Sequence, residues 1–141
     1  MVFLPGLNIQ WPISQEIISG KKTVETRTYP IPAKYIGVDI LLIETPGPSG
    51  DFKARAAGIL RFEESFQYKN KKEFYLDKRH LVTEDSDWSW KKKKWGWPIA
   101  SFTPFEKTFV IKTARGIVFT QKIKLPPSLP PVLRRSDSLS R

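Results

Sequence analysis

The order of apolar and polar segments along the chain predicts a series of strands with short helices between them. The most apolar run, VDILLIE at 38–44, is typical of a strand buried on both faces. The run KARAAGILRF at 53–62 predicts another strand, whose small residues allow close packing or tight curvature. Further strands are predicted at 6–11, 22–27, 95–102, 105–112 and 116–124.

Two short helices are predicted, each inserted between strands. In the first, residues 12–19, Pro12 suits the opening turn and Gly20 suits the position just past the end. The second helix covers residues 70–79, NKKEFYLDKR, with the apolar residues at 74–76 turned inward. Together these elements predict an α+β, β-dominated fold, a small, closed or nearly closed β-barrel of about six strands with two inserted helices.

A proline-rich stretch separates one predicted domain, residues 1–125, from a short tail, residues 126–141. The tail combines proline, serine and arginine, a composition that predicts disorder or an extended polyproline conformation. Its PxxP spacing is typical of ligands of SH3-type modules, which makes an adaptor role through the tail one hypothesis. Short patterns of this kind also recur by chance, so a plain tail is the simpler interpretation.

Composition narrows the chemistry. The net charge is +10, from 24 Lys and Arg against 14 Asp and Glu, which favours polyanionic partners such as RNA or single-stranded nucleic acid. The chain has no cysteine and one histidine, His80, so thiolate catalysis, disulfides and multi-histidine metal sites are excluded. No cofactor or metal site is predicted. No apolar run is long enough to span a membrane and no signal peptide is apparent, so a cytoplasmic protein without membrane contact is expected.

Residues 20–27, GKKTVETR, combine the composition of a β-strand with an unusual density of charge. Alternation places Thr23, Glu25 and Arg27 on one face of the strand, and Lys22 can swing towards them from the helix-to-strand junction. One interpretation is a surface ion-pair ladder worth well under ~1 kcal/mol. The other is a binding site, in which Lys22 and Arg27 bind an anion and Glu25 accepts from a base amine.

A second charged and aromatic region covers residues 80–99, HLVTEDSDWSWKKKKWGWPI. It contains His80, the lysine run 91–94 and four of the five tryptophans: Trp88, Trp90, Trp95 and Trp97. Interleaved aromatic and basic residues are typical of proteins that stack single-stranded nucleic acid. Alternation puts Trp95, Trp97 and Ile99 on one face, which is predicted to be core or pocket wall. The four lysines are predicted to be flexible, non-specific attractants for phosphate.

These residues together resemble the ASCH domain, a branch of the PUA-like superfamily, over about residues 6–125. The signature is a short helix that ends in Gly-x-Lys-x-x-Glu-x-Arg, formed here by Gly20, Lys22, Glu25 and Arg27. The flanking and downstream matches are Trp11-Pro12, Tyr29-Pro30, His80-Leu81-Val82 and Gly96-Trp97-Pro98-Ile99. The resemblance implies a small PUA-like barrel in which the charged strand lines a cleft for a nucleotide or nucleic acid.

The resemblance implies a binding domain for RNA or another nucleic acid, or for a modified nucleoside. The binding residues it implies are Trp11, Lys22, Thr23, Glu25, Arg27, Tyr29, His80 and Trp97. Some ASCH proteins instead hydrolyse N4-acetylcytidine through a Lys–Thr–Glu set, and others are linked to RNA cleavage. In that alternative Lys22 and Glu25 would be catalytic. Glu25 stands at the position of the threonine, however, so the hydroxyl nucleophile of that set is missing.

Overall fold

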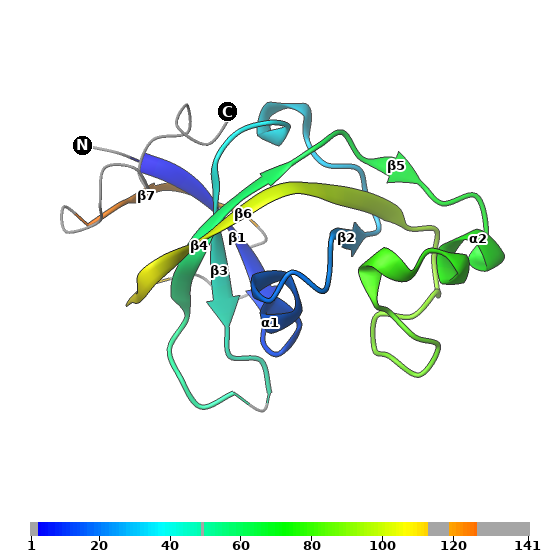
Figure 1. The fold of residues 1–141 in the computed structure, drawn as a ribbon, viewed down its shortest axis with the longest axis horizontal. Coiled ribbons are helices and arrows are strands. Elements are labelled where there is room, and N and C mark those ends of the chain that lie inside the picture. The colour runs from blue at the N-terminus through cyan, green and yellow to red at the C-terminus, as the bar shows by residue number, and fades with distance from the viewer. Residues whose placement is uncertain (1–2, 49, 113–118, 127–141) are drawn as a thin grey trace.

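Seven strands and two short α-helices make up the regular structure in a computed structural model of the protein (Figure 1). The structure describes residues 3–48, 50–112 and 119–126. The strands are β1 Phe3–Gln10, β2 Val24–Arg27, β3 Ile40–Thr45, β4 Arg55–Phe62, β5 Phe66–Gln67, β6 Trp95–Val110 and β7 Phe119–Lys124. The helices are α1 Ile13–Ile18 and α2 Lys71–Leu76, with 3₁₀ turns η1 Ala33–Tyr35 and η2 Lys78–His80.

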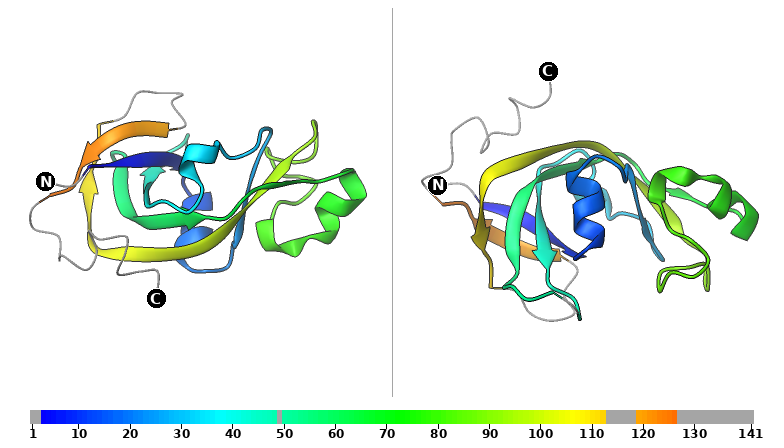
Figure 2. Two further views of the ribbon diagram at one scale, coloured as in Figure 1. Left: turned by 90° about the horizontal axis from the view of Figure 1, so that it is seen from above. Right: turned by 60° about the horizontal axis from the view of Figure 1, so that its bottom comes forward.

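All seven strands belong to one mixed sheet. The strand order is β2-β6-β4-β3-β1-β7, and β5 pairs with β6 on the edge opposite β2. Among the strands of the described residues, β1 and β3 are the one parallel pair, as expected for strands joined through a helical crossover, here α1 followed by β2. The other pairs are antiparallel. The sheet curls strongly, and α2 lies at the opposite end of the long axis from β7 (Figure 2).

The core lies on both sides of the two central strands. Residues 40–44 of β3 are buried throughout, which confirms the prediction from their apolar run, and residues 56–60 of β4 are buried throughout as well. One cluster contains Leu42, Leu60 and Trp97, and the other contains the alternate positions, with Ile43 and Ile59 among them. Burial on both faces follows from the curl, since α1 covers one face and the outer strands fold over the other.

The β-dominated α+β class predicted from the sequence is confirmed, while the predicted barrel is open. In the described residues β2 and β7 each pair with one strand only, so the sheet is not closed. The predicted strands 95–102 and 105–112 are one long strand, β6, with an irregularity between them. Gly58 lies opposite Pro104 whereas Ala56 lies opposite Phe109, so extra β6 residues bulge out where proline interrupts the ladder.

Other differences lie at the ends of elements and at α2. The second helix ends at Leu76 and not at residue 79, because Asp77 adopts an extended conformation before η2 begins. Of the three residues predicted to face inward there, Phe74 is buried, Tyr75 is half-buried and Leu76 is 69% exposed. Three successive residues cannot share one helical face, so that part of the prediction was wrong. The predicted tail lies outside the described residues except for Pro126, and its boundary stays a prediction.

Candidate functional site

The charged strand β2 lies at the end of the sheet order, yet it is buried on both faces. It pairs with β6, so that Glu25 lies directly opposite Trp97 and Arg27 opposite Trp95. Val24 points into the core and Glu25 is only 6% exposed on the other face. A solvated ion-pair ladder would leave this carboxylate in water. The burial of Glu25 therefore favours the second interpretation of the octet, a charged cluster built into the fold.

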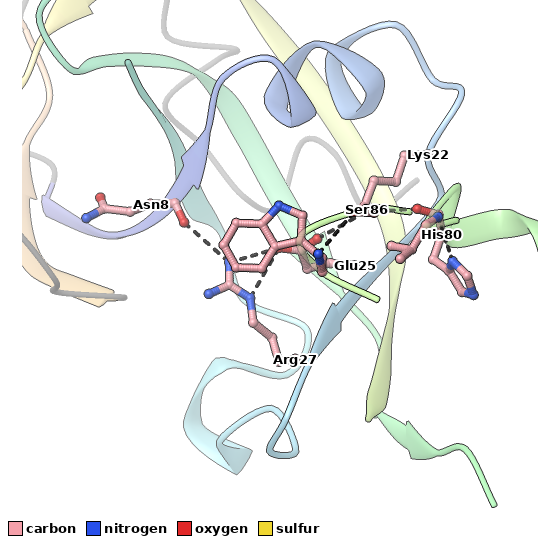
Figure 3. Close-up of polar contacts among 8 residues, drawn as sticks. Asn8, Lys22, Glu25, Arg27, His80 and Ser86 are labelled. Atoms are coloured by element: carbon pink, nitrogen blue, oxygen red, sulfur yellow. Dashed lines mark hydrogen bonds and ion pairs between the residues drawn. The ribbon is translucent and has the colours of Figure 1, made fainter. Parts of the chain in front are cut away.

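Two cations hold the Glu25 carboxylate, one at each oxygen (Figure 3). Arg27 donates from Nη2 at 2.8 Å and from Nε at 3.2 Å to Oε2. Lys22 Nζ lies 3.6 Å from Oε1. Lys22 itself is 4% exposed, and it also donates to the backbone carbonyl of His80 at 2.9 Å. The three charged residues of the sequence signature therefore lie in contact with one another. We call them the Lys22–Glu25–Arg27 cluster.

The electrostatics of the cluster keep Glu25 ionised. Burial raises the pKa of Glu25, but the charges of Arg27 and Lys22, together with the hydrogen bonds from Arg27, outweigh that effect. The pKa of Glu25 therefore lies below its ordinary value of 4.5. A carboxylate that stays charged at neutral pH is an acceptor only, which suits it to fix the orientation of Arg27.

Acid is expected to weaken the fold through this carboxylate. Because the pKa of Glu25 is lower in the folded protein, its stabilisation is fully present above the unfolded value of 4.5 and is lost as the pH falls through the folded value. Glu44 acts in the same direction. Burial raises its pKa, but hydrogen bonds from Ser14 and Gln15 outweigh that effect, so the pKa of Glu44 lies below its ordinary value. Urea denaturation at a series of pH values measures this loss. An unfolding free energy that stays constant from neutral pH into the acid range would contradict it.

Arg27 is the member of the cluster that reaches solvent, with a side chain 18% exposed. Its Nη2 also donates to the backbone carbonyl of Asn8 at 3.3 Å, and the guanidinium lies 5.7 Å from the centre of the Trp97 ring. These contacts fix Nε and Nη2. Within the described part of the chain no acceptor is present for the two N–H groups of Nη1. Arg27 is therefore a rigid guanidinium with one donor edge left over.

Trp97 and Tyr29 form the aromatic neighbourhood of Arg27. Trp97 is fully buried, and its indole N–H donates to the Tyr29 carbonyl at 3.0 Å. The two rings meet edge to face, 5.6 Å apart. The prediction that Trp97 forms core or pocket wall is confirmed as core. Tyr29 is half-buried, so it is the aromatic ring nearest the surface in this pair.

His80 acts on the cluster through its backbone. Its ring Nδ1 accepts from the Val82 N–H at 2.9 Å, so Nε2 carries the proton and donates to the Phe74 carbonyl at 2.7 Å. Burial lowers the pKa of His80 below its ordinary value, despite the Phe74 hydrogen bond. Both ring nitrogens are occupied, and the ring stacks on Phe74 at 4.1 Å. The side chain therefore positions the carbonyl that holds Lys22.

Two of the predicted binding residues lie outside these contacts. Trp11, just after β1, packs edge to face on Phe52, which lies in the connection between β3 and β4; the ring centres are 6.3 Å apart. Thr23 is exposed, and its backbone groups bond to Arg79 and Ile99. The sequence does not distinguish Trp11 and Thr23 from the members of the Lys22–Glu25–Arg27 cluster. Both lie in or beside the signature, and their positions depend on tertiary contacts. Their role in binding stays a prediction.

Lys94 is a residue that sequence reasoning missed. The first three lysines of the run, 91–93, are exposed as predicted, but Lys94 is only 7% exposed. It directly precedes Trp95, the partner of Arg27 across β2 and β6, so the strand register carries it to the edge of the cluster. The sequence carries no signal for this, because the four lysines of the run look alike and only the pairing of β6 with β2 separates Lys94 from the others. Trp88, by contrast, is exposed next to these lysines.

Other kinds of site find little support in the described residues. No group of three or more His, Asp or Glu side chains lies close enough together to hold a metal ion in the ranges that the structure covers. No helix among those ranges has the length and apolar character needed to cross a membrane.

Comparison with known proteins identifies the fold. No protein-family model matches the sequence, and no curated protein matches it. The structure is similar to that of ASCH from Zymomonas mobilis, with a TM-score of 0.63 and 16% identity, over 83% of this chain and 85% of that one. Two single-substitution variants of the same protein match with TM-scores of 0.62, at 15% and 18% identity, over 88% and 86% of their lengths. The chain therefore has the fold of an ASCH domain, as its signature predicted.

Proposed function

We propose that this chain, which has the fold of an ASCH domain, binds RNA through the Lys22–Glu25–Arg27 cluster and the basic surface beside it. The observation that carries the proposal is the fixed Arg27 guanidinium. Glu25 and the Asn8 carbonyl hold one side of it, and its Nη1 donors remain available at a partly exposed edge. A rigid guanidinium with two free donors suits bidentate contact with a phosphate or with a base edge.

The surroundings of the cluster support a polyanionic ligand. The exposed lysines 91–93 lie in the segment that leads to β6, next to the exposed ring of Trp88. The chain as a whole carries a net charge of +10. Flexible lysines attract phosphate without sequence preference, while an exposed indole can stack on an unpaired base. This combination favours single-stranded RNA, or a modified nucleoside within it, as the ligand class.

Arg27→Lys is expected to weaken binding of a short single-stranded RNA about tenfold, because lysine keeps the charge but loses the planar fork. Fluorescence anisotropy with labelled hexauridylate measures the affinity at low salt. Arg61→Lys is the matched control: Arg61 has the same 18% exposure and pairs with buried Asp39 at 2.7 Å. Arg61 lies opposite Ser101 of β6, whereas Arg27 lies opposite Trp95. Ser101 and Trp95 are separated by roughly 20 Å along an extended strand, so the control lies away from the cluster.

Two results would contradict the proposal. One is that the wild-type protein shows no hexauridylate binding at low salt, or binding that does not weaken as salt is added. The other is that Arg27→Lys and Arg61→Lys bind equally well. A thermal melt of each variant checks that both remain folded, so that a loss of affinity can be assigned to the contact.

A hydrolytic function is the second candidate, and one contact favours it. The Lys22 ammonium lies 3.6 Å from the Glu25 carboxylate, an arrangement in which lysine can stabilise an oxyanion while the carboxylate accepts a proton from water. The lowered pKa of Glu25 makes it a weak base, which places binding ahead. Incubation with N4-acetylcytidine, read by chromatography for cytidine, separates the two. Turnover that is lost in Lys22→Ala would make this chain an enzyme.

A further inference from the structure

Lys94 is a buried lysine whose ammonium has no hydrogen-bond or ion-pair partner in the described part of the chain. Although the residue is 7% exposed, its Nζ has no hydrogen-bond acceptor within the described ranges, and the closest aromatic contact is the Phe74 ring at 5.9 Å. The Lys94 Nζ atom itself keeps some contact with solvent. An ammonium carries three hydrogens and requires acceptors for them. A ligand at this position would supply them.

Lys94 belongs to the same assembly as the cluster. Lys22 donates to the His80 carbonyl, and the His80 ring stacks on Phe74 at 4.1 Å. Lys94 Nζ lies over that same Phe74 ring. Burial lowers the pKa of Lys94 and the charges of Lys22 and Lys91 lower it further, while Glu25 raises it. Lys94 is therefore within electrostatic range of both Lys22 and Glu25.

Positive charge exceeds negative charge at this place. Lys22, Arg27 and Lys94 are three cationic side chains, and Glu25 is the one carboxylate among them. Arg27 occupies one oxygen of that carboxylate and Lys22 lies at the other. Charges that are removed from water need a counter-charge or become neutral. The excess at Lys94 would be balanced by an anionic group from outside the chain.

We propose that Lys94 binds a phosphate group of the RNA, beside Lys22 and at the inner edge of the Lys22–Glu25–Arg27 cluster. This inference rests on the proposed function and makes it more specific. The ligand must bring an anion to a defined point, so a nucleotide binds better than the corresponding nucleoside. Lys94 then differs from its neighbours 91–93, which attract phosphate from an exposed surface without fixing its position.

The test compares Lys94→Met with Lys93→Met. Both variants lose one lysine from the same run, so their net charge is identical, but Lys93 is exposed. Methionine also keeps much of the apolar stem of Lys94 against Phe74, so the melting temperature of Lys94→Met is not expected to fall. Affinities for labelled hexauridylate are measured by anisotropy, and those for uridine 5′-monophosphate and uridine by calorimetry.

Lys94→Met is expected to bind hexauridylate about tenfold more weakly than the wild type, against less than about twofold for Lys93→Met, because only Lys94 makes a desolvated charge-assisted contact. The wild type should prefer uridine 5′-monophosphate over uridine, and Lys94→Met should lose this preference. Equal affinities of the two variants, or no preference for the monophosphate in the wild type, would overturn the inference. A wild type that binds no hexauridylate at low salt would instead refute the proposed function itself.

Discussion

Glu25→Gln is expected to lower the free energy of unfolding by about 3–5 kcal/mol, the usual cost of removing one partner from a buried ion pair. Glutamine fills the same space but has no charge. Lys22 then keeps its hydrogen bond to the His80 carbonyl but loses its counter-charge, and Arg27 keeps neutral acceptors only, the Asn8 carbonyl and the new amide oxygen. A buried lysine and a partly exposed arginine without a counter-charge cost more than one lost hydrogen bond. Urea denaturation at neutral pH measures the effect.

Two further variants show whether the loss comes from unbalanced charge. Glu64→Gln makes the same chemical change at an exposed glutamate and should change the unfolding free energy by less than about 0.5 kcal/mol. Lys22→Met combined with Glu25→Gln removes one of the stranded cations, so the double variant should be more stable than Glu25→Gln alone. A single variant as stable as the wild type would mean that Glu25 is solvated and that the cluster is not buried.

The sequence was sufficient to predict the members of this cluster. Alternation along the strand placed Glu25 and Arg27 on one face, and the junction after the helix brought Lys22 to the same point. The apolar runs at 38–44 and 53–62 likewise predicted the two central strands, because continuous apolar sequence has few other stable positions. These are local rules, and they act within about ten residues.

Properties that depend on distant partners could not be predicted. The burial of Glu25 arises from its pairing with Trp97, more than seventy positions away along the chain. Lys94 looks identical to the three lysines before it, and only the register of β6 separates it from them. The sequence did not predict that β6 continues past Pro104. The strand continues because a bulge opposite β4 accommodates the proline without ending the pairing. In each case a contact between strands decided what a local pattern left open.

Fold likeness and site chemistry contribute different parts of the functional argument. The similarity to ASCH from Zymomonas mobilis, at 16% identity, establishes an ASCH-domain fold and no more. The proposed RNA binding rests on Arg27, whose Nη1 lacks an acceptor within the described residues, and the further proposal of a phosphate contact rests on Lys94, whose Nζ lacks one there too. A fold can host unrelated functions, so these two side chains carry the proposal and the fold sets only its context.

Glu44→Ala is expected to lower the free energy of unfolding by about 3–5 kcal/mol, through a second buried carboxylate that ties α1 to the sheet. Glu44 is 1% exposed at the end of β3. Its Oε2 accepts from Ser14 Oγ at 2.5 Å and from Gln15 Nε2 at 2.6 Å, both in α1. Its Oε1 accepts from Arg55 of β4 at 2.8 Å. Alanine removes every acceptor in this arrangement, and chemical denaturation measures the loss.

The consequence of Glu44→Ala should reach the RNA site, because α1 also holds the start of the charged strand. The Lys22 backbone N–H donates to the Glu16 carbonyl in α1 at 2.9 Å, so a loosened helix removes one constraint on Lys22. Hexauridylate affinity is therefore expected to fall several-fold under conditions where the variant is still folded. Glu106→Ala, at an exposed glutamate of β6, is the control for both measurements. A stability loss with unchanged affinity would show that β2 and its pairing with β6 hold Lys22 in place without help from α1.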